Sequence, residues 1–260
     1  MFKKLICFFL LLIFLFSFFY ISVFAESAEY SWFIKRNGNK RPVLQKGQEI
    51  INEYNAFYID NNVNDDSEDK VIYITFDAGY ENGNIAKIMD ALKEESVCAA
   101  FFILDNIILK NTELVTRMVT EGHTVCNHTK NHKNLSGATE RDIESNIKSL
   151  EILFKEKTGY EMSKYFRFPE GRYSENALKC VKSLGYKTIF WSFAYDDWDN
   201  SRQPDTKRAF KKIIDNTHNG AVFLFHPTSK TNAEIFPELI KEWRRMGYRF
   251  GTLDELVSDI

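Results

Sequence analysis

Asp77 is the first residue in the chain whose position suggests chemistry. It follows Val71–Phe76, a run of β-branched and aromatic residues typical of a strand buried on both faces of a parallel sheet. Parallel α/β folds place reactive groups at the carboxyl ends of strands, so Asp77 is a candidate catalytic acid or base. The alternative is that Asp77 only caps the helix or turn that follows.

Other polar side chains come at the ends of three further stretches that read as strands. They are His128 and His132, Arg167, and His226. If the strands are parallel and form a barrel, their carboxyl ends meet on one face, and these side chains should lie near Asp77. This convergence favours a functional site more strongly than any one residue does.

His128 and His132 are spaced i, i+4. On a helical turn this spacing puts both imidazoles on one face, close enough to share a divalent metal such as zinc, cobalt or nickel. Taken alone, two such histidines are more often ordinary surface residues. His123 begins its strand and is predicted to be structural, and His218 is predicted to be exposed at a helix end.

Arg167 carries a fork of donors that can hold a carboxylate through two hydrogen bonds. Its expected role is to orient Asp77 and keep it ionised, and the alternative is a purely structural salt bridge. Pro169 and Gly171 follow it closely and would stiffen and turn the chain, which fits the wall of a groove.

Aromatic side chains near the predicted strand ends are candidates for stacking on sugar rings. Trp198, in the polar stretch 196–203, is the better candidate, and Tyr80 is the second. Trp191 lies inside a predicted strand and is expected to pack in the core.

The pattern of the chain predicts an α/β fold, because short apolar runs alternate with amphipathic segments. Strands are predicted at 71–76, 97–104, 123–127, 165–168, 187–193, 221–225 and 249–252. Helices are predicted at 84–95, 112–121, 139–157, 174–183, 205–216 and 232–246. About seven parallel strands in a domain of this size favour a distorted barrel, with an open sheet as the alternative.

Residues 1–25 are typical of an export signal. Lys3 and Lys4 precede an almost wholly apolar run over 5–20, and Val23–Ala25 offers small residues for a signal peptidase. An uncleaved membrane anchor is the alternative, and either one takes the protein out of the cytoplasm. The predicted division is a signal or anchor at 1–25, an N-terminal arm and loop at 26–70, and a catalytic domain at 71–260.

Composition limits the kinds of partner that the protein is expected to bind. The formal charge is −2, and no basic stripe suggests nucleic acid binding. Contact with a membrane is expected only through the N-terminal segment. The oligomeric state is open, with a monomer as the default. Cys98, Cys126 and Cys180 are too few and too widely spaced for a disulfide scaffold and are expected to be buried free thiols.

Taken together, the motifs resemble the polysaccharide deacetylase family, the NodB-like carbohydrate esterases, from Val71 to the C-terminus. The five matching stretches, in the family's order, are Thr75–Gly79, His128–His132, Arg167–Gly171, Asp197–Trp198 and Leu224–His226. The resemblance implies a NodB-type barrel, Asp77 as catalytic base, His128 and His132 as metal ligands, and His226 as general acid. Zinc is the metal expected first, with cobalt or another divalent ion as the alternative.

Two positions depart from the family pattern. Ala78 stands where a second Asp usually binds the metal, and Ala194 stands where the fourth motif usually opens with Asp. The first departure leaves two histidine ligands, so water, substrate oxygens or Asp77 must complete the metal's coordination. The second leaves open which group sets the pKa of His226.

The stretch Thr75–Gly83 most resembles the delta-lactam-biosynthetic de-N-acetylases. That branch implies removal of acetyl from N-acetylmuramic acid in spore-cortex peptidoglycan, with glycan strands as the partner. Two alternatives are a deacetylase of another N- or O-acetylated polysaccharide, and a non-catalytic glycan-binding protein.

Overall fold

The computed structural model describes residues 28–258. The predicted export segment 1–25 lies outside these residues. Within 28–258, no helix is both long enough and apolar enough to cross a membrane.

One curled parallel sheet forms the centre of the molecule. Its order is β10-β3-β4-β5-β6-β8-β2, with β9 paired to the other side of β3. Seven of its eight described strands follow residue 70: β3 (Val71–Ala78), β4 (Ala100–Ile103), β5 (Thr124–Asn127), β6 (Tyr165–Phe166), β8 (Lys187–Ile189), β9 (Ala221–Phe225) and β10 (Arg249–Phe250). The predicted α/β fold with about seven parallel strands is therefore confirmed.

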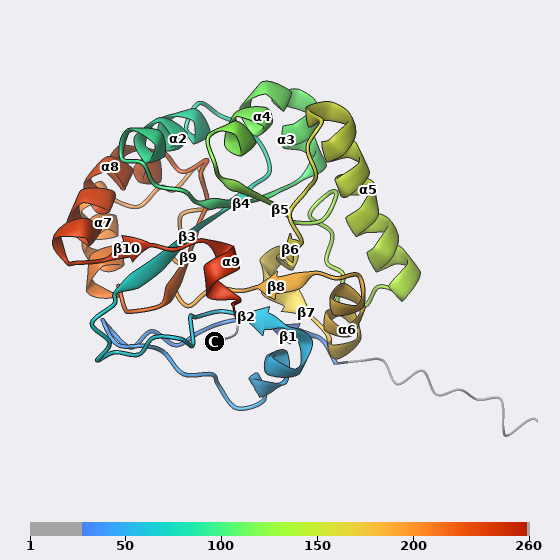
Figure 1. Ribbon diagram of the computed structural model, residues 1–260, viewed down its shortest axis with the longest axis horizontal. Coiled ribbons are helices and arrows are strands. Elements are labelled where there is room, and N and C mark those ends of the chain that lie inside the picture. The colour runs from blue at the N-terminus through green and yellow to red at the C-terminus, as the bar shows by residue number, and fades with distance from the viewer. Residues whose placement is uncertain (1–27, 259–260) are drawn as a thin grey trace, which may run out of the picture.

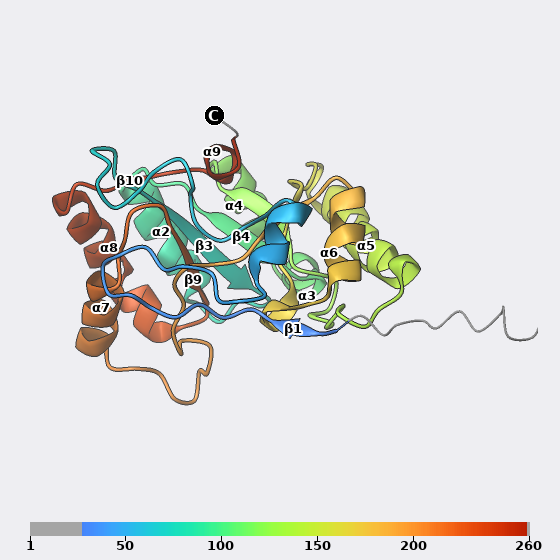
Figure 2. The same ribbon diagram turned by 90° about the horizontal axis from the view of Figure 1, so that it is seen from below.

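The sheet curls toward a barrel because the chain beyond β8 returns to β9. Phe193 forms a parallel bridge with Phe223, and the amide of Leu224 donates to the carbonyl of Phe193 at 2.9 Å. The carboxyl ends of β3, β5, β6 and β9 therefore open toward a common region. Figure 2 shows the carboxyl end of β3 on the same side as the long loop between β8 and α7.

Helices surround the outside of the sheet (Figure 1). They are α2 (Ile85–Glu94), α3 (Asp105–Lys110), α4 (Thr112–Thr120), α5 (Glu140–Thr158), α6 (Glu175–Ser183), α7 (Thr206–Asp215) and α8 (Lys230–Arg245). The short α9 (Leu253–Leu256) instead lies in the middle of the view in Figure 1, between β3 and β8. Thr139 caps α5 by accepting a hydrogen bond from the amide of Asp142, as the capping pattern predicts.

The core explains why β3 stays rigid. Every residue of β3 except Asp77 is buried, and Phe76 stacks on Phe101 with ring centroids 5.0 Å apart. Fully burying a side chain such as that of Phe76 contributes about 1.5–3 kcal/mol to stability. Asp77 is thus presented from a strand whose other side chains are fixed by packing.

The N-terminal segment adds to the sheet. It holds β1 (Tyr30–Ser31), the 3₁₀ helix η2 (Glu49–Tyr54) and β2 (Ala56–Phe57). β2 pairs in parallel with β8, and β1 pairs in antiparallel with β7 (Arg172–Tyr173). The proposed boundary between 26–70 and 71–260 stays a prediction, since strands of both parts share one sheet.

Trp32 fixes this segment against the site. Its indole N–H donates to the carbonyl of Trp191 at 3.0 Å, and its ring stacks on Phe190 with centroids 4.5 Å apart. Gly171, at the end of the 3₁₀ turn η3 (Pro169–Gly171), has φ +65°, and a Cβ there would lie 2.9 Å from the Cβ of Trp32. Only glycine allows this close approach without strain.

The structure tests the expectations for two further histidines and for the cysteines, with different results. His123 is structural as predicted: it is buried, and its Nδ1 accepts from the amide of Ala99 at 3.2 Å. His218 is not exposed but 2% accessible, because it lies under the N-terminal segment and bonds Ser192 at 2.8 Å. Cys98, Cys126 and Cys180 are free thiols as expected, but only Cys126 and Cys180 are buried, so the expected burial of Cys98 is wrong.

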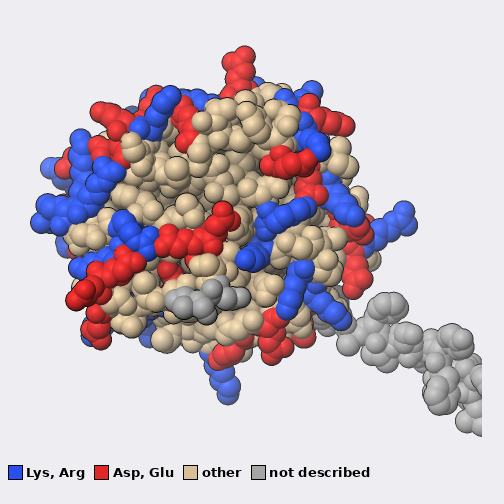
Figure 3. All heavy atoms as spheres, viewed as in Figure 1, with Lys and Arg blue, Asp and Glu red and all other residues tan. Residues whose placement is uncertain are grey.

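Charge is mixed over the face shown in Figure 3, where Lys and Arg lie interspersed with Asp and Glu. This face carries no continuous basic stripe of the kind that binds nucleic acid.

Candidate active site

Asp77 and Arg167 form a buried ion pair at the carboxyl end of β3. Arg167 Nη1 donates to Asp77 Oδ1 at 2.8 Å. Two further donors of Arg167 bond backbone oxygens, Nε to the carbonyl of Ile189 at 2.9 Å and Nη2 to that of Phe190 at 3.2 Å. The guanidinium also lies 4.1 Å from the ring centroid of Phe102. Arg167 is therefore held in place by these contacts, and it gives Asp77 one hydrogen bond rather than the two that its fork could offer.

This environment keeps Asp77 ionised. Burial alone would raise the pKa of its carboxyl. The positive charges that His128, when protonated, and Arg167 place beside it outweigh burial, so the pKa of Asp77 lies below its ordinary value. The Asp77 side chain is 11% exposed, so one oxygen can still meet a small substrate or water.

His128 and His132 do not lie on a helical turn, and that part of the sequence prediction is wrong. They lie in the loop after β5, where Thr129 has φ +71° and His132 has φ +58°. The two left-handed residues fold the loop back on itself. The imidazoles still meet, with ring centroids 5.1 Å apart and planes at 73°.

The donor set around His128 fits a divalent metal. Its Nδ1 lies 2.9 Å from the carbonyl of Arg167, which can only accept, so Nδ1 carries the proton. Its Nε2 then has a free lone pair, is buried without a hydrogen-bond partner, and lies 3.5 Å from Asp77 Oδ2. Burial lowers the pKa of His128 to about 4, so the ring is neutral at pH 7, the form that binds metals.

The protein offers few ligands at this point. Across residues 28–258, no group of three or more His, Cys, Asp or Glu side chains is arranged to hold a metal ion. Ala78, buried at the end of β3, brings no ligand atom. His128 and His132, with the Asp77 carboxylate alongside, are the donors the site supplies.

Asp197 holds His226, a contact that sequence reasoning did not assign. His226 follows β9, and its Nδ1 lies 2.7 Å from Asp197 Oδ1. The backbone amide of His226 donates to Asp197 Oδ2 at 2.8 Å. Burial lowers the pKa of His226, but the Asp197 carboxylate more than offsets this, so the pKa lies above its ordinary value. Asp197 thus supplies the negative charge that Ala194 cannot.

A second layer fixes Asp197. Asn232, near the start of α8, donates from Nδ2 to Asp197 Oδ2 at 2.6 Å, and its Oδ1 accepts from the Tyr195 hydroxyl. Ser229 caps α8 by accepting from the amide of Asn232 at 3.1 Å, which sets the position of this side chain. The Asp197–Trp198 motif was the sequence signal that could have led to this network.

Asp77 and His226 line one cavity of about 640 Å³. Its lining residues are Arg36, Asp77, His132, Glu170, Trp191, Ala194, Tyr195, Asp196, Trp198, Leu224 and His226. Both a carboxylate and an imidazole therefore reach the same space. The sequence did not point to Arg36, which arrives from the N-terminal segment.

The predicted sugar-binding residues lie at different places. Trp198 lines the cavity and is 60% exposed, as a stacking surface requires. Tyr80 is exposed near the same loop, where Asn200 donates to its hydroxyl, but it does not line the cavity. Pro169 is buried, and its neighbour Glu170 lines the cavity instead. Trp191 lies past the end of β8 and lines the cavity as well, so its assignment to the core alone is wrong.

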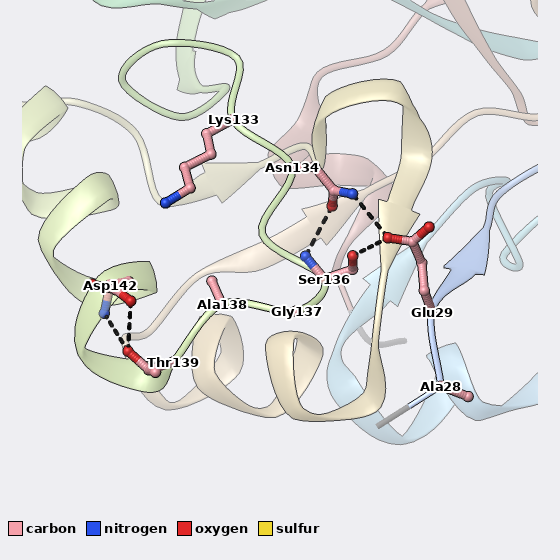
Figure 4. Close-up of a pocket in the computed structure, with 9 residues that line it drawn as sticks. All are labelled: Ala28, Glu29, Lys133, Asn134, Ser136, Gly137, Ala138, Thr139 and Asp142. Carbon is pink, nitrogen blue, oxygen red and sulfur yellow. Dashed lines mark hydrogen bonds between the residues drawn. The ribbon is translucent and has the colours of Figure 1, made fainter. Parts of the chain in front are cut away.

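A second hollow of about 660 Å³ lies beside the histidine loop (Figure 4). Glu29 Oε2 accepts from Asn134 Nδ2 at 2.8 Å and from the Ser136 hydroxyl, and Oε1 accepts from Arg172 Nε at 2.9 Å. The hydrogen bonds from Ser136, Asn134 and Arg172 lower the pKa of Glu29 to about 2. Glu29 therefore ties the N-terminal segment to the chain that follows His132.

The chain is similar to known proteins over most of its length. The family model described as polysaccharide deacetylase matches residues 64–189. The peptidoglycan-N-acetylmuramic acid deacetylase PdaA of Bacillus subtilis is 36% identical over 231 residues, which are 88% of this chain and 86% of that protein. The chain belongs to the polysaccharide deacetylase family. The family resemblance drawn from the five sequence motifs is thereby confirmed.

Solved structures agree with the deacetylase fold. The structure of Bacillus subtilis PdaA, a family 4 carbohydrate esterase, has a TM-score of 0.82 at 35% identity and covers 88% of this chain and 96% of that one. A family 4 carbohydrate esterase from Bacillus anthracis has a TM-score of 0.72 at 33% identity, with the same two coverages. The deacetylase is thus a hydrolase of amide bonds with a NodB-type fold.

Proposed function

We propose that this deacetylase removes the acetyl group from N-acetylmuramic acid in peptidoglycan, a step toward the muramic δ-lactam of the spore cortex. The observation that carries the proposal is a pair of ionisable groups in one cavity, Asp77 held by Arg167 and His226 held by Asp197. A relative named for this reaction is 36% identical to the chain and supports the choice of substrate.

Asp77 is the general base in this proposal. An acetamide is a poor electrophile, so its attacking water must lose a proton as the new bond forms. Arg167 binds Asp77 Oδ1 at 2.8 Å, which leaves Oδ2 as the oxygen that takes this proton. The lowered pKa of Asp77 ensures that the carboxylate is ionised at neutral pH.

His226 is the general acid. Because its Nδ1 donates to Asp197, its Nε2 is the atom that can give a proton to the departing sugar amine. The raised pKa keeps the imidazolium populated nearer neutral pH than an ordinary histidine would allow. The products are acetate and a free amino sugar.

His128 and His132 would hold a divalent cation, with zinc proposed and cobalt or nickel as alternatives. Such an ion, when bound, polarises the acetyl carbonyl and makes its water a stronger nucleophile. The fixed tautomer of His128 and its buried, unpartnered Nε2 support this role. Because Ala78 brings no ligand, the affinity should be lower than that of a three-ligand site.

The proposal places the protein outside the cytoplasm, where peptidoglycan lies. The export pattern over 1–25 supports this location. The glycan strand would lie across the cavity, with Trp198 as a stacking surface for a sugar ring at the rim.

Acetate release from peptide-stripped peptidoglycan strands tests the proposal. Wild-type protein should release acetate, chelation should lower the rate, and added zinc should restore it. Chitin oligomers are the matched substrate without muramic acid and should be poor substrates. Faster release from chitin would make the protein a deacetylase of another polysaccharide. Binding of strands with no acetate release at any metal concentration would make it a non-catalytic glycan-binding protein.

A further inference from the structure

Arg36 is the one Lys or Arg side chain that lines the active-site cavity among the described residues. It comes from the N-terminal segment, which is anchored on both sides of it. On one side the amide of Trp32 donates to the carbonyl of Gly171 at 2.8 Å. On the other, Arg41 Nη1 donates to the carbonyl of Asn219 at 2.8 Å. The backbone that carries Arg36 is therefore held at a fixed place beside the cavity.

The guanidinium of Arg36 is oriented but not neutralised. Its Nη2 donates to the carbonyl of Ala194 at 2.7 Å, and its Cζ lies 5.4 Å from the ring centroid of Phe193. Within residues 28–258 it has no carboxylate partner at ion-pair distance, although other surface arginines such as Arg172 and Arg249 have them. One carbonyl contact leaves donors of the fork unused.

Apart from His226, whose raised pKa favours the protonated ring, the other formal charges on the cavity wall are negative. Asp77 is already paired with Arg167, and Glu170 and Asp196 add two carboxylates. An anionic group of a substrate is repelled from these two carboxylates and attracted to Arg36, the one lining cation outside the histidines His132 and His226 that serve the reaction in the proposed function. The wall thus favours an orientation in which a carboxylate near the acetamide meets Arg36.

We propose that Arg36 binds the lactyl carboxylate of muramic acid and so determines the specificity for muramic acid over glucosamine. This inference rests on the proposed function, because it names how the same cavity recognises that sugar. N-acetylglucosamine has no lactyl ether and therefore no carboxylate with which Arg36 could form an ion pair. A muramic acid that still carries its stem peptide has an amide at this position, so an amidase must act before Arg36 can form the ion pair.

Binding measurements with two forms of one glycan test the assignment. The first ligand is peptide-stripped peptidoglycan strands with free lactyl carboxylates, and the second is the same strands with those carboxylates converted to methylamides. Calorimetry gives Kd for wild type, Arg36→Gln, Arg36→Lys and Lys35→Gln. Lys35 is the matched control, since it is an exposed cation next in sequence that does not line the cavity.

Wild type and Lys35→Gln should bind the carboxylate strands about 10-fold more tightly than the methylamide strands, the size of one charge-assisted hydrogen-bonded contact. Arg36→Gln should bind both forms as wild type binds the methylamide form. Arg36→Lys should fall between, because it keeps the charge but loses the fork.

The assignment is overturned if wild type binds both forms equally, if Arg36→Gln keeps the preference, or if Arg36→Gln weakens both forms alike. Acetate release measured in the same samples judges the proposed function separately. A retained carboxylate preference without acetate release contradicts the proposed catalysis and supports the role of Arg36. Acetate release without the preference supports the proposed catalysis and contradicts the role of Arg36.

Discussion

Replacing Asp197 with asparagine should remove most of the activity while the protein stays folded. Asp197 accepts three hydrogen bonds, from the His226 amide, His226 Nδ1 and Asn232 Nδ2, and it is fully buried. An asparagine at this position can turn its side-chain oxygen toward the His226 amide and Asn232 Nδ2, the two groups that donate to Asp197 Oδ2. Its NH₂ group then faces Nδ1 of His226. The histidine must then be neutral, and the contribution of a general acid, about 100- to 10,000-fold in rate, is lost.

The cost to stability should be smaller. One charge-assisted hydrogen bond is lost and two weaken, which corresponds to about 1.5–3 kcal/mol in the free energy of unfolding. Urea denaturation should show that the variant is still folded without urea, under the conditions of the activity assay, so the loss of activity is not a loss of structure.

The pH dependence gives the sharper test. Asp197 raises the pKa of His226, so its removal should move the alkaline limb of the kcat/KM profile to lower pH. A raised folded-state pKa contributes stability below the unfolded pKa of about 6.5, and this is lost as pH rises through the folded pKa. That pH-dependent part of the stability should be missing in Asp197→Asn.

Asp199→Asn is the matched control, because Asp199 lies in the same loop and bonds Ser201 rather than His226. It should behave as wild type in rate and pH profile. An Asp197→Asn variant with activity within about 2-fold of wild type and an unmoved alkaline limb would refute the role given to Asp197.

Three further predictions concern other parts of the site. Arg167→Met should lower the free energy of unfolding by about 3–5 kcal/mol, measured by urea denaturation, because it leaves the Asp77 carboxylate without its buried partner; a change below about 1 kcal/mol would contradict this. Glu29→Ala should weaken zinc binding by about 10-fold in calorimetry, because the chain after His132 loses its tie to the N-terminal segment, and unchanged affinity would show that Glu29 has no effect on the metal. Trp198→Ala should raise KM for glycan strands by about 10-fold with little change in kcat; a fall in kcat alone would contradict a stacking role.

The sequence predicts most strand ends of the main sheet to within about two residues, because those strands are apolar and parallel, although the strand predicted at 187–193 already ends at Ile189. Their carboxyl ends must then face one side, and Asp77, Arg167 and His226 lie there for that reason alone. The family motifs add the expected role of each side chain, with Asp77 as the base and His226 as the acid. The i, i+4 spacing of the two histidines was a weaker guide, because left-handed residues at Thr129 and His132 replace the helical turn.

What the sequence could not reveal depends on contacts between distant segments. Asp197 meets His226 across 29 positions, and its loop has no periodicity that fixes its path. Arg36 reaches the cavity because Trp32 packs against Phe190 and Trp191, a contact that spans more than 150 residues. No local pattern in the N-terminal segment signals such packing, so nothing in the sequence singles out Arg36.

Mass analysis of muropeptides tests the central claim most directly. Peptide-stripped strands would be treated with wild type or with Asp77→Asn, digested, and examined for muramic acid that has lost its acetyl group. The account predicts deacetylated muramic acid with wild type, intact glucosamine acetyl groups in the same strands, and no product with Asp77→Asn. Equal amounts of deacetylated muramic acid from both proteins would contradict it.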